Sequence, residues 1–132
     1  MKISANIQSS HNLHETTVRT DNDVRQIQIA PKASGLGSSV NGGELLALAL
    51  ATCFCNDIYR EAAKRNINVT RVEIEVTSEF GAEGETGKNF HYKANINADA
   101  SPEEITALIH HTDKVAEIQN TLRKGVNVNL IM

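Results

Sequence analysis

Two cysteines are the residues of this 132-residue chain best suited to redox chemistry. Cys53 and Cys55 lie two positions apart in a segment that we expect to be helical. At about 100° per residue, their side chains point about 200° apart, so the pair cannot form a disulfide within an intact helix. The spacing is neither a CxxC redox motif nor a useful metal clip, because the two thiols face opposite ways. We therefore expect any chemistry to depend on a single thiol.

Cys53 is the better candidate for a reactive thiol. It shares a helix face with the charged residues Asp57, Arg60 and Lys64, and the same face is apolar toward the N-terminus. A partly desolvated thiol near cations favours the thiolate form, which is the nucleophile. The alternative is that Cys53 and Cys55 are simply small buried hydrophobic residues.

The histidines do not extend this pair into a metal site. His11, His14 and His91 fall on expected strands or turns, without a recognised zinc spacing. His110 and His111 are expected at the C-terminal end of a helix, where positive charge is stabilising. The sequence therefore predicts no metal and no cofactor.

Composition limits the class of protein. The length fits a single domain over residues 1–132, and 16 acidic against 13 basic residues give a net charge of −3. Nucleic-acid binders usually carry a basic surface, so we expect no nucleic-acid partner. The apolar run 45–55 is too short to span a membrane, and the N-terminus lacks the apolar core of a signal peptide. Two cysteines and no export signal predict a cytoplasmic protein.

The first half of the chain reads as strands followed by a long helix. Alternating patterns predict strands at 2–8, 13–19 and 24–30, followed by a glycine-rich loop. A helix is expected at 42–65, with Asn41 and Glu44 forming a capping box. Its first half is apolar on every side, which is typical of a helix that is buried all round. A second subunit is the simplest cover, so we expect a homodimer.

The second half predicts a hairpin, two helices and a last strand. The strands are expected at 71–80 and 89–98, the helices at 102–110 and 113–124, and the last strand at 126–132. Strands that arrive as hairpins predict an α+β fold with antiparallel sheets.

Two segments resemble the OsmC/Ohr superfamily of osmotically induced and organic hydroperoxide resistance proteins. Asn41 to Phe54 is similar to the start of the family's central helix, which ends in Cys-Phe. Gln119 to Val128 is similar to a family run of the form Ser-Asn-Thr-Leu-Arg-Lys-Gly-Val. The order of expected elements agrees with the family over nearly the whole chain.

The resemblance implies an intertwined homodimer, with long central helices between antiparallel sheets and sites at the dimer interface. Catalytic members of the family reduce organic hydroperoxides. A thiolate on the central helix attacks the peroxide and becomes a sulfenic acid. A second cysteine resolves it as a disulfide, and an Arg and a Glu hold the thiolate and the substrate. By this resemblance Cys53 is the attacking thiol.

The other family positions are not matched. The resolving cysteine aligns with Ala116, and the family's Glu aligns with Gly43, one residue before Glu44. The family's Arg has no secure counterpart, since its region offers only Lys32 and, further back, Arg25. Any sulfenic acid on Cys53 must then be reduced by an external thiol, unless Cys55 of the other subunit resolves it.

Two classes of function follow from these residues. The first is an OsmC-like thiol-based redox protein that reduces organic hydroperoxides through Cys53 with an external thiol reductant. The second is a non-catalytic dimeric module that binds a small apolar ligand in an interface cleft lined by Leu46, Leu50 and Phe54. A thiol sensor that reacts without turnover is a third alternative.

Overall fold

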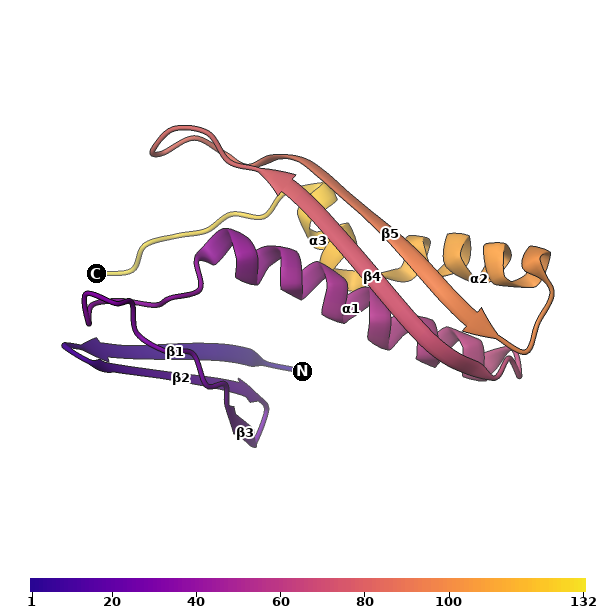
Figure 1. The fold of residues 1–132 in the computed structure, drawn as a ribbon, viewed down its shortest axis with the longest axis horizontal. Helices are drawn as coiled ribbons and strands as arrows, with labels where there is room; N and C mark the ends of the chain where they lie inside the picture. Colours follow the sequence, from indigo (N-terminus) through magenta and orange to yellow (C-terminus); the bar gives the residue numbers. More distant parts are fainter. The chain divides into compact units, whose positions relative to one another are not determined.

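The computed structural model describes residues 1–132, which form two compact units, 1–44 and 45–132. Figure 1 gives the order of the elements along the chain. The fold is α+β, with antiparallel strands in both units and three helices, as the sequence predicts. None of the three helices has the length and apolar character needed to cross a membrane. Each unit is described by itself.

The first unit contains a three-stranded antiparallel sheet. Strands β1 (Ile3–Ser10), β2 (Leu13–Thr20) and β3 (Asp23–Gln26) lie in the order β1-β2-β3. The two tight turns between them place Asn12 and Asp21 at positive φ (62° and 50°), a conformation that Asn and Asp tolerate best after Gly.

The third strand is shorter than predicted. Pairing with β2 ends at Gln26, and beyond Ile27 the chain turns into a loop. Alternation continues to residue 30, but Ala30 and Pro31 precede a turn in which Pro31 makes only an isolated bridge to Ser38. The predicted strand 24–30 is therefore wrong in its second half, because no neighbouring strand continues there.

The long helix α1 (Gly42–Lys64) begins and ends where the sequence predicts. The Glu44 amide donates to Asn41 Oδ1 at 2.8 Å, and the Asn41 amide donates to Glu44 Oε1 at 3.1 Å. This is the predicted capping box. After the last turn, Asn66 takes a positive φ of 54°, which ends the helix.

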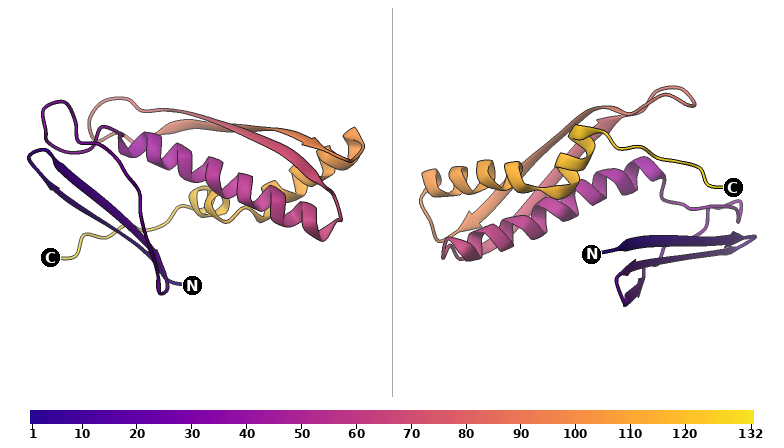
Figure 2. Two further views of the ribbon diagram at one scale, coloured as in Figure 1. Left: turned by 60° about the horizontal axis from the view of Figure 1, so that its bottom comes forward. Right: turned by 180° about the vertical axis from the view of Figure 1, so that it is seen from behind.

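The second unit packs α1 against a hairpin and two shorter helices. The hairpin is formed by β4 (Val69–Glu79) and β5 (Lys88–Ala98), and the helices are α2 (Pro102–Val115) and α3 (Glu117–Lys124). Figure 2 shows the hairpin running along α1. The core is apolar and comes from α1, β5, α2 and the α2–α3 junction: Phe54, Ile58, Ala62, Ile96, Leu108 and Ala116.

The helices after the hairpin differ from the prediction. Helix α2 continues through His110 to Val115, because Thr112 is buried and its hydroxyl bonds back to the Leu108 carbonyl inside the helix. The break comes at Ala116, whose backbone is extended, and α3 starts directly after it.

The C-terminal segment 126–132 is not a strand, which corrects the alternation-based prediction. Its alternating apolar side chains are exposed, Val128 and Leu130 by 91% and 87%. A strand requires a hydrogen-bonded neighbour, and this segment pairs with none.

Candidate functional site

The Cys53 thiol lies at the centre of a charged cluster within the second unit. The half-buried Sγ is 3.5 Å from Asp57 Oδ2, one helical turn further along α1. It is also 3.9 Å from Glu117 Oε2, in the first turn of α3. Residues 64 positions apart in the sequence therefore meet at this sulfur.

The start of α3 supplies a hydrogen-bond donor to the same sulfur. The backbone N–H of Ile118 faces Cys53 and acts to lower the pKa of its thiol. Ala116, the residue that precedes α3, has no side-chain acceptor to cap the helix. The sulfur therefore takes the position of a capping acceptor, where helix N–H groups favour negative charge.

Arg60 is the cation of the cluster. Its Nη1 lies 2.9 Å from Asp57 Oδ1 and 3.2 Å from Glu117 Oε1. Its Nε lies 2.9 Å from Glu61 Oε1. The Asp57 carboxylate is only 6% exposed, so the guanidinium compensates a charge that would otherwise be buried alone. Arg60 thus holds both carboxylates that contact the thiol.

A second layer of charges surrounds Glu61. Lys64 Nζ lies 3.0 Å from Glu61 Oε1, and His111 Nε2 lies 3.1 Å from Glu61 Oε2. Hydrogen bonds from Lys64, Arg60 and His111 lower the pKa of Glu61 to about 2. His111 therefore does not sit at a helix end as predicted. It lies within α2 and ties that helix to α1.

The protonation state of Cys53 differs from the expectation of a cation-stabilised thiolate. Burial is the largest influence and raises the pKa of the Cys53 thiol. The Ile118 N–H lowers this pKa, whereas the Asp57 and Glu117 carboxylates raise it. Burial also raises the pKa of Asp57. The cations on this face are already paired with carboxylates, so at neutral pH the resting sulfur is protonated and donates to Asp57.

The structure separates the other predicted site residues. Ala116 is fully buried in the core against which Cys53 packs, so the family's resolving position lies close to the thiol. Cys55 lines a different surface hollow together with Ile74. Lys32 and Arg25 belong to the first unit, outside the unit that holds the cluster.

Glu44 serves as a cap on α1, in agreement with its sequence-based interpretation as a capping residue. Sequence reasoning missed Glu117 altogether. The acidic residue in the first turn of α3 reads as an ordinary helix-start residue. No local spacing indicates that it reaches α1.

The cluster also has the composition of a small cation site. One ligand atom each from Cys53, Asp57 and Glu117 lies within 4.8 Å of the others. Arg60 already binds both carboxylates, so a metal ion would have to displace its guanidinium.

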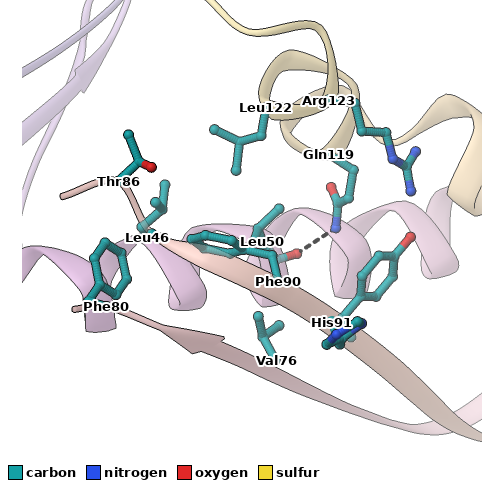
Figure 3. A pocket seen from close by; sticks show the side chains of 12 residues that line it. Leu46, Leu50, Val76, Phe80, Thr86, Phe90, His91, Gln119, Leu122 and Arg123 are labelled. Carbon is teal, nitrogen blue, oxygen red and sulfur yellow. Dashed lines mark hydrogen bonds between the residues drawn. The ribbon is translucent and has the colours of Figure 1, made fainter.

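A pocket of about 560 Å³ lies beside the same face of α1 (Figure 3). Its wall is built by α1, the hairpin and α3, all in the second unit, and is mostly aliphatic and aromatic. Of the three residues expected to line an apolar cleft at a dimer interface, Leu46 and Leu50 line this pocket and Phe54 does not. Phe54 is fully buried and packs edge-on against Tyr92, with ring centroids 4.9 Å apart.

The comparisons with known proteins agree with this fold. The chain resembles an OsmC-like protein from Mycoplasma pneumoniae with 19% identity and a TM-score of 0.66, over 92% of this chain and 86% of that one. It also resembles the organic hydroperoxide resistance protein OhrB of Bacillus subtilis, with 18% identity, 96% and 94% coverage and a TM-score of 0.58. An organic hydroperoxide resistance protein OsmC from Legionella pneumophila matches with 21% identity, 93% and 90% coverage and a TM-score of 0.54.

At these identities the structural matches show the fold alone. No curated protein matches the sequence significantly. The family model described as OsmC-like protein matches residues 35–131, which is most of the chain and includes the whole Cys53 cluster. The chain therefore belongs to the OsmC-like protein family.

Proposed function

We propose that this protein is a thiol-based redox protein that reduces organic hydroperoxides through Cys53. The observation that carries the proposal is the placement of one half-buried thiol between a carboxylate proton acceptor, Asp57, and a backbone donor, the Ile118 N–H. Two proteins with the same fold are named for organic hydroperoxide resistance, which supports the same substrate class.

In the proposed reaction the Cys53 sulfur attacks the outer oxygen of the hydroperoxide. An S–O bond forms, the O–O bond breaks, and the thiol and hydroperoxide become a sulfenic acid and an alcohol. The thiol proton passes to Asp57 and then to the departing alkoxide, so that charge and atoms balance. The raised pKa of Asp57 suits a carboxylate that takes up and returns a proton.

Arg60 takes the place of the family's missing cation in this proposal. It contacts both carboxylates that contact the thiol, at 2.9 and 3.2 Å. Its positive charge offsets their repulsion toward the thiolate that forms during the reaction. The guanidinium comes from the same helix as the thiol: Arg60 is seven residues after Cys53 and three after Asp57, on a shared face.

The reductant is proposed to be an external thiol. Ala116 occupies the resolving position, and Cys55 lines a different hollow. One external thiol would attack the sulfenic acid, releasing water and forming a mixed disulfide, and a second would release Cys53 as a thiol. Both cysteines are free, which fits the reducing cytoplasm that we propose as the location.

Intact-mass analysis of the reduced protein with cumene hydroperoxide tests the proposal. A gain of one oxygen at Cys53, with dimedone trapping of the sulfenic acid, is expected in the native chain and in Cys55→Ser. Loss of both signals is expected in Cys53→Ser. Turnover with added thiol would identify a peroxidase, and a single oxidation without turnover would identify a sensor. A Cys53 that does not react with the hydroperoxide would overturn both the peroxidase and the sensor.

We also propose that the protein is a homodimer. All of β1 is exposed, including Ile3 and Ile7, and the first unit has no second layer over its sheet. The segment 126–132 exposes an alternating apolar pattern without a strand partner. Light scattering should give twice the mass of the chain, and removal of residues 126–132 should shift it toward the monomer. A monomer in the native chain at micromolar concentration would overturn the proposal.

A second candidate function is ligand binding without turnover. The pocket beside α1 favours it, because its volume and apolar wall suit a small organic molecule. An inert Cys53 together with a ligand held in the pocket would make this the better description.

A further inference from the structure

The Gln119 side chain gives the apolar pocket one specific polar group. Gln119 lies on α3, is 3% exposed and lines the pocket. Its Nε2 donates to the Leu50 carbonyl at 3.0 Å. Figure 3 shows this nitrogen turned to the Leu50 carbonyl and the amide oxygen turned away from it.

The Gln119 amide oxygen has no hydrogen-bond partner. Oε1 is buried and unpaired, although the amide nitrogen is satisfied. The opposite amide orientation would bring two acceptors together at Leu50, so the oxygen cannot exchange places with the nitrogen. An unpaired buried acceptor costs roughly 1–3 kcal/mol, which a donor on a bound molecule would recover.

The guanidinium of Arg123 in the pocket wall is already paired and favours a neutral ligand over an anion. Arg123 lines the pocket, but its guanidinium is held by Asp113, at 2.5 Å from Oδ1 and 3.0 Å from the carbonyl oxygen, and by Asn120. The Tyr92 hydroxyl also donates to Asp113. The positive charge of Arg123 is therefore already compensated, and an anion would lose its hydration without a free guanidinium to offset the loss.

We propose that this pocket binds a neutral amphiphile with an apolar body and one O–H donor, and that Gln119 Oε1 accepts its hydrogen bond. Alcohols and hydroperoxides both have this chemistry. The inference extends the second candidate function and, through the hydroperoxide, rests in part on the first. Because Oε1 has no solvent contact, a wall side chain must move for the donor to reach it. Leu122, on the same helix, lines the pocket and is 39% exposed.

Three ligands that differ only at the head group test the proposal. We would titrate 1-octanol, octyl methyl ether and octanoate into Cys53→Ser and follow the binding by calorimetry and by the amide resonances of Gln119. The alcohol is expected to bind about five- to tenfold more tightly than the ether, as one hydrogen bond predicts. Octanoate is expected to bind most weakly. Equal affinities, or tightest binding by octanoate, would overturn the inference.

Two variants assign the donor preference to Gln119. Gln119→Met keeps the length of the side chain and removes the acceptor, so the alcohol should lose its advantage while the ether still binds. Gln26→Met, on an exposed strand of the first unit, is the matched control and should retain the full preference. If Gln119→Met fails to fold, the comparison of the three ligands in the Cys53→Ser protein still tests whether the pocket prefers an O–H donor.

The use of Cys53→Ser separates this inference from the redox proposal. Octanol cannot oxidise a thiol, and the variant has no nucleophile at position 53. Selective octanol binding with an inert native Cys53 would overturn only the redox function. A reactive Cys53 with no preference for octanol would overturn only the role of Gln119.

Discussion

The Cys53 sulfur donates to the Asp57 carboxylate one helical turn away, at 3.5 Å. The carboxylate stabilises the protonated thiol and repels the thiolate, so it contributes to the raised pKa of Cys53. Asp57→Asn should therefore lower this pKa and make iodoacetamide react several-fold faster at pH 7. The pH profile of alkylation, followed by intact mass in a Cys55→Ser background, measures the shift.

Asp23→Asn provides the control for this change. It removes the same charge from an exposed position in the first unit and should not change the pH profile of Cys53 alkylation. An unchanged profile in Asp57→Asn would mean that burial alone holds the thiol protonated.

Arg60 should be essential for stability as well as for chemistry. Arg60→Gln removes the guanidinium that pairs with the carboxylates of Asp57 and Glu61, which are only 6% and 5% exposed. Removing one partner of a buried charge network costs about 3 kcal/mol of unfolding free energy. Urea denaturation should show this loss, and Arg60→Lys should recover only part of it, since an ammonium lacks the planar fork. A loss below 0.5 kcal/mol, about that of a surface pair, would contradict the network.

Glu61 should make stability depend on pH in the acid range. Its pKa is lowered to about 2 from an ordinary 4.5, so its contribution is present above pH 4.5 and lost as the pH falls toward 2. Glu61→Gln should be less stable than the native protein at pH 7, and the difference should shrink between pH 4.5 and 2. Denaturation at several pH values, with the exposed loop variant Glu83→Gln as control, measures this. If the stability difference between Glu61→Gln and the native protein were constant with pH, it would come from packing and not from the charge of Glu61.

Ala116→Cys tests whether the resolving position is still in place. Ala116 belongs to the core cluster against which Cys53 packs, so an introduced thiol should meet the oxidised Cys53 and form an intramolecular disulfide. Non-reducing peptide mapping after one equivalent of cumene hydroperoxide should find the cross-link, with loss of the dimedone adduct. Cross-linking to Cys55 instead would show that α1 or α3 rearranges on oxidation.

Local patterns predict most of the fold, because they reflect contacts close in the sequence. The Asn41–Glu44 capping box is present, and the hairpin of β4 and β5 lies where alternation indicates. The segment 126–132 has the same alternation and is not a strand, since pairing depends on a neighbour that local pattern does not supply.

The candidate site was only half visible in the sequence. Cys53, Asp57 and Arg60 share one face of a single helix, so their spacing predicts that they meet. Glu117 and the Ile118 N–H reach the thiol through the break at Ala116, which tertiary packing determines. The sequence placed cations near the sulfur but could not show that carboxylates already bind them. Burial of the thiol, the largest influence, and the two carboxylates beside it together raise the thiol pKa instead of lowering it.

The Ile118 N–H favours negative charge on the Cys53 sulfur, and this effect is thermodynamically reciprocal. Whatever free energy the sulfur gains from the start of α3, α3 gains from the sulfur. Oxidation or alkylation of Cys53 changes the acceptor, so the fraying of α3 should change with it, and hydrogen exchange at Ile118 would record the event. Gln119 is the next residue on that helix. A change in the oxidation state of one sulfur should therefore also alter the helix turn that carries the buried, unpaired Gln119 oxygen of the neighbouring pocket.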